Sequence, residues 1–260
     1  MKWTIEAEEE IKKVPFFVRK KVKKRVEKEA LEDNKKIVTI SEVRLTQKRF
    51  LSNMSKEVKG YQIENCFAGC PNGVNNSEGL IEKLQSLFEE EDILGFLKES
   101  VDGDLKFHHE FRVTVAECPN GCSQPQIKDI GIIGAFVPSV SEEECSMCSM
   151  CIDTCKENAI ELNSEKNIPE IDMEACLYCG ACEKVCPTGT IIKKMAGYRV
   201  QIGGKLGRHP RLAKELNGIF SEEEVVEIVK KCVRFYKKNS VGGKRFSMLL
   251  MERDISEIGL

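Results

Sequence analysis

The sequence predicts an α+β protein with three parts. Residues 1–58 have the apolar spacing of helices, residues 59–140 and 191–260 mix strand-like and helix-like segments, and residues 141–190 hold a doubled cysteine motif. A hydrophobic content of 41% with 32% charged residues is typical of a folded globular chain. The formal net charge of −2 favours no nucleic-acid partner.

Three helices are expected in the first part. Thr4 can cap a helix that runs to Lys13, and Pro15 can open the next one, which ends near Asp33. Ser41 is expected to cap the third. Its apolar face would hold Val43, Phe50, Leu51, Met54 and Val58.

Lys and Arg fill most polar positions between Lys12 and Lys28, with apolar residues at helical spacing among them. A solvated helix face is the simpler interpretation of this run, and an anion-binding surface is the alternative.

The second part begins with a helix and a strand. Residues 77–91 form an amphipathic pattern with Leu80, Ile81, Leu84 and Leu87, and residues 111–116 alternate as a strand does. Residues 129–137 are apolar with interspersed glycines and predict a strand and a turn.

The third predicted strand follows the cysteine-rich segment, at residues 198–202. It leads into the glycine-rich run 203–208. Ser221 and Glu224 form a capping-box pattern that opens a helix to about Lys238, and the tail is expected to be a loop and a short helix. Cys232 lies in register with the apolar residues of that helix and is expected to be a buried structural cysteine.

The thirteen cysteines point to metal ligation in a reducing compartment. No stretch is as long as a membrane span, and the N-terminus has no apolar signal core, so a cytoplasmic protein without membrane contact is expected. In such a setting, closely spaced cysteines are metal ligands more often than disulfides.

Eight cysteines form one motif twice, in the spacing Cys-x-x-Cys-x-x-Cys-x-x-x-Cys. The fourth cysteine of such a motif ligates the other cluster in two-cluster ferredoxins, and eight thiolates in this pattern are not zinc spacing. One [4Fe–4S] cluster is therefore assigned to Cys145, Cys148, Cys151 and Cys186, and the other to Cys155, Cys176, Cys179 and Cys182. The segment resembles bacterial two-cluster ferredoxins, although Lys156 stands where a proline is usual.

A third set of four consists of two separate pairs, Cys66 with Cys70 and Cys118 with Cys122. The spacing alone leaves both zinc and a third [4Fe–4S] cluster open.

The residues around these pairs carry a more specific resemblance. Residues 111–122, then Gln124-Pro125-Gln126 and Ile130-Gly131, resemble the siroheme and cluster signature of the sulfite and nitrite reductases. Residues 203–210 look like the second glycine-rich segment of the same family. A ferredoxin insert between the two segments is typical of its dissimilatory and anaerobic branches.

The resemblance implies a siroheme-dependent reductase of a small oxyanion, sulfite or nitrite. Cys66, Cys70, Cys118 and Cys122 would hold the third cluster, with Cys122 bridging to the siroheme iron. An external low-potential electron donor would supply the two ferredoxin clusters. The implied catalytic residues are Cys122, Arg112 and Lys128, and the implied cofactor contacts are Arg112, Asn120, Cys122, Lys205 and Arg208. Siroheme carboxylates need cationic partners, and Arg211 is a further candidate.

The histidines His108, His109 and His209 all lie near these motifs in the sequence. Each is a candidate proton donor, although a lone histidine more often has a structural role.

Two departures from the family pattern affect these expectations. Cys66 and Cys70 have three residues between them where the family usually has five. A second related half-domain, which members that reduce sulfite usually carry, is not recognised in the chain. A homo-oligomer is therefore expected, in which a neighbouring chain covers the siroheme and residues 12–28 are one possible source of cations.

The first fifty residues resemble another module instead. Trp3-Thr4, Glu6-Ala7 and the run from Val14 to Val22 are similar to the small C-terminal domain of the dark-operative protochlorophyllide reductase B subunit. Two alternatives to a reductase stay open on the sequence. One is an electron-transfer protein with three clusters and no siroheme, and the other is a factor that handles tetrapyrroles.

Overall fold

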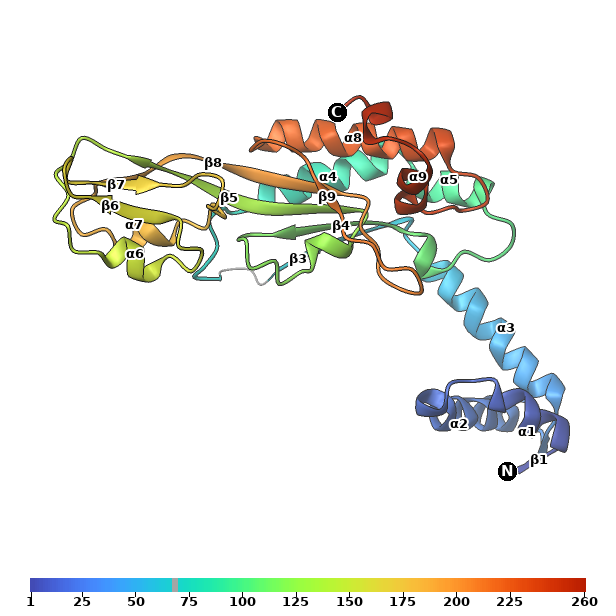
Figure 1. Cartoon of the computed structure of the whole chain (residues 1–260). Coiled ribbons are helices and arrows are strands. Elements are labelled where there is room, and N and C mark those ends of the chain that lie inside the picture. The colour runs from blue at the N-terminus through green and yellow to red at the C-terminus, as the bar shows by residue number, and fades with distance from the viewer. Residues whose placement is uncertain (67–69) are drawn as a thin grey trace. The chain divides into compact units, whose positions relative to one another are not determined.

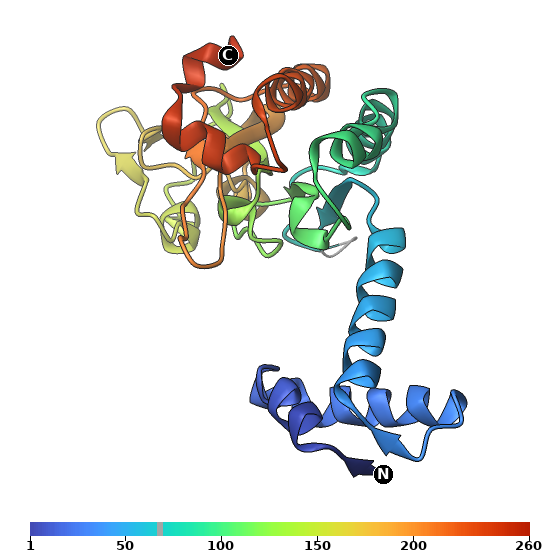
Figure 2. The same cartoon turned by 90° about the vertical axis from the view of Figure 1, so that its right-hand side faces the viewer.

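The computed structural model describes residues 1–66 and 70–260, without the side chains of residues 52–54. The chain forms two compact units, one of residues 1–58 with 101–108 and one of residues 59–100 with 109–260 (Figure 1, Figure 2). In the described part of the chain, no helix is both long and apolar enough to cross a membrane.

The first unit is helical. Helix α1 spans Ile5–Lys12 and begins at Thr4, whose hydroxyl accepts the Ala7 N–H at 3.4 Å. Helix α2, Phe16–Glu32, starts directly after Pro15. These two helices confirm the sequence expectation. A parallel pair of short strands, β1 (Lys2–Trp3) and β2 (Ile37–Val38), lies beside them. The core of the unit consists of Ala7, Ile11, Val26, Ala30, Val38 and Val43.

The third helix, α3 (Ile40–Glu57), begins elsewhere than predicted. Thr39 is its N-cap, and the Glu42 carboxylate returns to the Thr39 N–H at 2.8 Å. Ser41 was the wrong cap because only Thr39 has a glutamate three residues later to complete the reciprocal box. Phe50 of the predicted apolar face is 45% exposed, and the side chain of Met54 lies outside the described residues.

Replacing Thr39 with alanine should lower the free energy of unfolding by about 1 kcal/mol, because an N-cap bond is lost. Ser41→Ala, the matched control, should change it by only a few tenths. The Thr39 hydroxyl is the first cause that lowers the pKa of Glu42 below its usual 4.5. A lowered carboxyl pKa stabilises the fold at higher pH, so the difference between wild type and Thr39→Ala should shrink as the pH falls through that pKa. Denaturant unfolding at pH 7 and at pH 3 measures the free energy of unfolding. Equal decreases for Thr39→Ala and Ser41→Ala would contradict Thr39 as the N-cap.

The second unit is built on a five-stranded sheet in the order β3-β4-β5-β8-β9. Strands β3, β4 and β5 run parallel, and β8 and β9 run antiparallel to their neighbours. The strands span Tyr61–Asn65 (β3), Phe111–Ala116 (β4), Ile130–Val140 (β5), Ile191–Ile202 (β8) and Lys214–Glu215 (β9). The strand at residues 111–116 agrees with the sequence expectation.

Strands β5 and β8 are longer than the sequence predicts. They pair from Ile130↔Ile202 to Val140↔Ile191, and no turn interrupts residues 129–137. Strand β4 ends at the pair Ala116↔Ile133. Beyond this pair, β5 and β8 continue as a two-stranded ribbon past the carboxyl ends of β3 and β4 (Figure 1).

Helices cover one face of the sheet (Figure 1). They are α4 (Glu78–Glu90), α5 (Ile93–Ser100), α8 (Glu222–Asn239) and α9 (Phe246–Glu252). Phe111 of β4 faces them, with its ring centroid 5.2 Å from Phe246 and 5.3 Å from Tyr236. Since side chains alternate along a strand, Arg112 and Thr114 lie on the opposite face.

Three expectations for these helices are confirmed. The capping box of Ser221 and Glu224 opens α8, and Cys232 is fully buried on that helix. Leu80, Leu84 and Leu87 form the buried stripe of α4.

The cysteine-rich segment forms a small lobe at the end of the β5–β8 ribbon (Figure 1). It contains α6 (Met150–Thr154), α7 (Ala181–Val185) and the hairpin of β6 (Ile160–Asn163) and β7 (Ile168–Ile171). Its core consists of Cys151, Ile160, Cys182 and Ile191. The ribbon extends past the carboxyl ends of β3 and β4, which lead into their cysteines. The lobe therefore lies beyond those strand ends.

Candidate metal centre

The third cysteine set begins at the carboxyl ends of two neighbouring parallel strands. Cys66 directly follows β3, and its N–H donates to the Val115 carbonyl at 3.0 Å. Cys118 follows β4 after Glu117, whose N–H donates to the Cys66 Sγ at 3.2 Å. Ligand sites in sheets with parallel strands form at such strand ends, because the loops there meet.

A tight turn brings Cys122 back toward the same place. The Gly121 N–H donates to the Cys118 carbonyl at 3.2 Å, with Gly121 at a φ of +62°. The Asn120 side-chain amide donates to the Cys122 Sγ at 3.0 Å, and Cys122 is exposed. This contact directs the Asn120 amide at the Cys122 sulfur.

Cys66, Cys118 and Cys122 lie close enough to influence one another electrostatically. Burial raises the pKa of the Cys66 thiol most, the Glu117 N–H opposes it, and negative charge on Cys118 and Cys122 raises it further. Cys70 follows residues 67–69, which lie outside the described residues. Its carbonyl accepts the Gly73 N–H at 2.9 Å.

The first ferredoxin quartet surrounds one cavity in the lobe. The four cysteines that line it are Cys145, Cys148, Cys151 and Cys186. The Ser146 side chain is the main cause that lowers the pKa of Cys148. Cys186 is therefore grouped with the first three cysteines of the other motif copy.

The second quartet combines Cys155, from the first motif copy, with Cys176, Cys179 and Cys182 of the second copy. Negative charge on Cys179 and Cys155 raises the pKa of Cys176, although burial is the larger cause. Burial also raises the pKa of Cys182 to about 11, with Cys176 and Cys179 adding to the shift. Thiols in such surroundings ionise poorly unless a metal takes the charge.

The doubled motif has a doubled backbone conformation. Met147 and Ser149 have φ values of +54° and +63°, and the corresponding residues Tyr178 and Gly180 have +60° and +70°. The N–H groups of Met147 and Tyr178 each donate to the first cysteine Sγ of their motif at 3.4 Å. Loops that wrap around a sulfur set and direct N–H groups at it suit an iron–sulfur cluster, whose potential depends on such bonds. In the described part of the chain, no three His, Cys, Asp or Glu side chains converge on a point where one metal ion would touch all of them.

The predicted basic residues differ in their surroundings. Lys128 forms an ion pair with Glu64 of β3. The Thr114 hydroxyl lies 3.2 Å from the Glu64 carbonyl and 3.3 Å from the carbonyl of Ser123, the residue that follows Cys122. Arg112 is half-buried on the same face of β4.

The second glycine-rich segment packs against the loop that follows Cys122. A Cβ at Gly204 would lie 2.6 Å from the Gln126 carbonyl, so only glycine allows this approach. Lys205 is buried, and its Nζ lies 2.8 Å from the Met248 Sδ of α9. Arg208 is exposed.

The remaining predicted residues fall in different places. Arg211 donates to the Ser247 carbonyl at 3.4 Å, and His209 is exposed on the loop between Lys205 and Arg211. His108 belongs to the first compact unit and His109 to the second.

Two acidic residues near the centre were not predicted. Glu64 is the ion-pair partner of Lys128, and Glu117 is a buried carboxylate next to Cys118. The signal for Glu64 was present, because residues 61–65 directly precede Cys66 just as residues 111–116 lead to Cys118. Recognising that parallel would have predicted β3.

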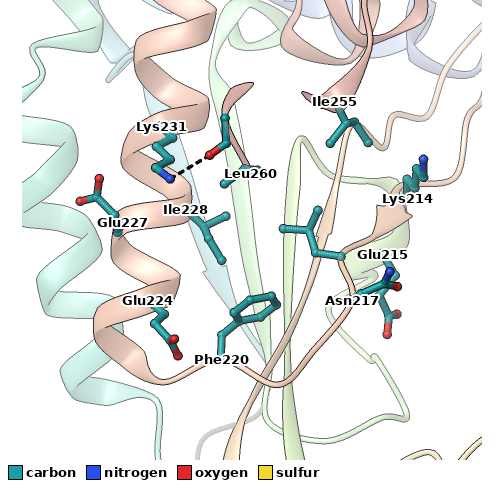
Figure 3. A pocket seen from close by; sticks show the side chains of 12 residues that line it. Lys214, Glu215, Asn217, Phe220, Glu224, Glu227, Ile228, Lys231, Ile255 and Leu260 are labelled. Atoms are coloured by element: carbon teal, nitrogen blue, oxygen red, sulfur yellow. Dashed lines mark hydrogen bonds between the residues drawn. The ribbon is translucent and has the colours of Figure 1, made fainter. Parts of the chain in front are cut away.

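A cavity of about 560 Å³ lies outside the cysteine sets (Figure 3). It is bordered by β9, α8 and the last residues, and Phe220 and Ile228 point into it. Lys231 Nζ donates to the Gly259 carbonyl at its edge at 2.9 Å. Its lining contains no cysteine and no residue of the metal centre.

Comparisons with known proteins identify related families and a related fold. Residues 62–258 match the family model of the nitrite and sulphite reductase 4Fe-4S domain, and residues 3–46 match that of the proto-chlorophyllide reductase 57 kD subunit. The crystal structure of dissimilatory sulfite reductase I superposes with a TM-score of 0.51 at 12% identity, over 75% of this chain and 50% of that one. This likeness confirms the α+β fold.

Two curated relatives are similar in sequence. The coenzyme F420-dependent sulfite reductase of Methanocaldococcus jannaschii is 32% identical over 169 residues, which cover 65% of this chain and 26% of that protein. The dissimilatory-type sulfite reductase subunit beta of Archaeoglobus fulgidus is 29% identical over 121 residues, 43% of this chain and 33% of that protein. The chain thus spans about a quarter to a third of the length of these relatives. Because the 4Fe-4S domain model extends over most of the chain, this protein belongs to the nitrite and sulphite reductase family.

Proposed function

We propose that this protein is a siroheme-dependent reductase that converts sulfite to sulfide, with electrons delivered through two ferredoxin clusters. The observation that carries the proposal is that Cys66 and Cys118 follow the adjacent strands β3 and β4, with Cys122 on the turn after Cys118. When bound, siroheme and its linked cluster would supply the electrons and the iron at which the oxyanion is reduced. The names of the relatives favour sulfite over nitrite.

The chain's own residues would perform the surrounding tasks. Cys66, Cys70, Cys118 and Cys122 would hold the third cluster, and Asn120 would stabilise the Cys122 thiolate through its amide. Arg112, Arg208 and Lys205 would bind siroheme carboxylates, with charge-assisted bonds that are stronger than neutral ones. Lys128 would bind the anion, and Glu64 would hold the Lys128 ammonium in place until the anion arrives.

Three [4Fe–4S] clusters predict about twelve irons per chain, with one more for siroheme. Anaerobic purification, iron and sulfide analysis and a visible spectrum test this, because siroheme has Soret and red bands that clusters lack. Siroheme bands together with sulfide formation from sulfite and a reduced viologen are the expected result. About eight irons, or zinc in place of the third cluster, would overturn the reductase proposal.

A second candidate is an electron-transfer protein without siroheme. One observation favours it, because Lys128 is already paired with Glu64, and Lys205 is buried against Met248. The same spectrum separates the two candidates, since twelve irons without siroheme bands, even after supply of siroheme, would favour electron transfer.

A homo-oligomer is part of the proposal. Cys122 is exposed, and the loop that packs against Gln126 and Lys128 presents Leu206 and Leu212, which are 65% and 70% exposed. Apolar side chains at the edge of a polar site are typical of a surface that a second chain covers.

Light scattering on the holo-protein should therefore give the mass of a dimer or a larger oligomer. Leu206→Glu with Leu212→Glu should shift it toward the monomer, because charge would enter the contact. The matched control is Val241→Glu with Met251→Glu, at two exposed apolar residues outside this loop. A monomeric holo-protein that still reduces sulfite would remove this part of the proposal.

A further inference from the structure

The second cysteine quartet is held directly on strand β5. The Phe136 N–H donates to the Tyr178 carbonyl at 2.8 Å, and Phe136 forms an isolated parallel bridge with Cys179. The next residue, Gly180, packs on the Phe136 side chain, since a Cβ there would lie 2.9 Å from the Phe136 Cγ. The lobe thus folds back on the start of the ribbon, in addition to being joined to the ribbon's far end.

The same stretch also reaches the third cysteine set. Lys184 of α7 donates from its Nζ to the carbonyl of Pro71 at 3.1 Å, and Pro71 follows Cys70 directly. This contact joins residues that are 113 positions apart in the sequence.

Strand β5 provides a second link to the third set. Gly134 lies two residues before Phe136, on the same face of the strand. A Cβ at Gly134 would lie 2.5 Å from the Glu117 carbonyl, and Glu117 precedes Cys118. One short piece of β5 therefore contacts a neighbour of Cys179 at one end and a neighbour of Cys118 at the other.

The first quartet has different surroundings. Leu162 and Pro169 of the β6–β7 hairpin line its cavity. Thr190, which also lines it, donates from its hydroxyl to the Glu144 carbonyl at 3.2 Å. These neighbours belong to the lobe and to the end of the ribbon that joins it.

We propose that Phe136, Tyr178, Gly180, Lys184 and Pro71 form a docking seam that holds the second quartet against the third cysteine set. The second quartet is then the inner one of the lobe, and the first is the outer one. The inference rests on the proposed cluster ligation and adds the order of the two ferredoxin sites. The seam residues are positioning residues, because none of them is itself a proposed ligand.

Electron paramagnetic resonance of the reduced holo-protein tests the order, because neighbouring paramagnetic clusters broaden one another's signals and speed their relaxation. Cys145→Ser removes a ligand of the outer site, and the magnetic interaction with the third-set cluster should persist. Cys176→Ser removes a ligand of the inner site, and that interaction should be lost. The opposite pattern would overturn the proposal.

A glycine pair tests the seam without touching a ligand. Gly180 and Gly189 share a φ of +70°, but a Cβ at Gly180 meets Phe136 whereas a Cβ at Gly189 meets nothing within 4 Å. Gly180→Ala should weaken the interaction with the third-set cluster, and Gly189→Ala should retain it with the same backbone strain. Lys184→Ala should act in the same direction as Gly180→Ala, with the exposed Lys194→Ala as its control.

Iron analysis of every variant distinguishes a failure of the docking seam from a failure of the proposed clusters. Variants with full iron and an unchanged interaction would overturn the seam and leave the proposed clusters standing. Wild-type protein without three clusters would instead remove the proposed function.

Discussion

Cys122→Ser should reduce the rate of sulfite reduction on the order of a thousandfold or more. Cys122 would hold the third cluster, and loss of groups that only orient a ligand already costs about 10–100-fold. Viologen-driven sulfide formation measures the rate, and the visible spectrum reports whether siroheme remains.

Two further variants provide an intermediate loss of rate and a control without loss. Asn120→Ala removes the amide that lies 3.0 Å from the Cys122 Sγ, and it should cost about 10–100-fold with the cluster retained. Cys232→Ala changes the buried cysteine of α8 and should leave the rate per folded molecule unchanged. A Cys122→Ser protein with wild-type spectrum and rate would exclude Cys122 as a ligand of the third cluster.

Removal of iron should unfold the cysteine-rich lobe before the rest of the second unit. Two of the four residues in the lobe core are the cysteines Cys151 and Cys182, so few apolar contacts remain once the metal–thiolate bonds are gone. Small metal-bound modules obtain most of their folding free energy from those bonds. We expect tryptic cleavage after the exposed Lys156 and Lys166 to accelerate by about tenfold or more in the iron-free protein.

The helical first unit provides the internal control. It has its own apolar core around Ala7 and Ile11, so cleavage after the exposed Lys20 should keep its rate when iron is removed. Mass spectrometry of timed digests identifies the cut sites. Equal protection of residues 141–190 with and without iron would show that the lobe folds without its clusters.

Local signals in the sequence were sufficient where the interacting groups are a few residues apart. The capping pattern of Ser221 and Glu224 predicts the start of α8, because both partners lie within one helical turn. The prediction of Ser41 as a cap was wrong because the capping box is also local, and Glu42 stands three residues after Thr39.

The positions of strand ends depended on partners far away in the sequence. Residues 138–140 and 191–197 do not show a clear alternation, yet they form strands because each completes the backbone hydrogen bonds of the other. The short strand β3 was missed for the same reason, because its pairing with β4 reaches across fifty residues.

The sequence by itself determined that the chain contains a doubled ferredoxin motif and two further cysteine pairs in a sulfite-reductase-like setting. Those inferences depend on spacing along the chain, which is independent of the fold. Only the tertiary structure decided that Cys66 and Cys118 meet at adjacent strand ends, that Glu64 pairs with Lys128, and that Lys184 reaches Pro71. Each of these contacts joins residues at least fifty positions apart, and strand order and register bring them together.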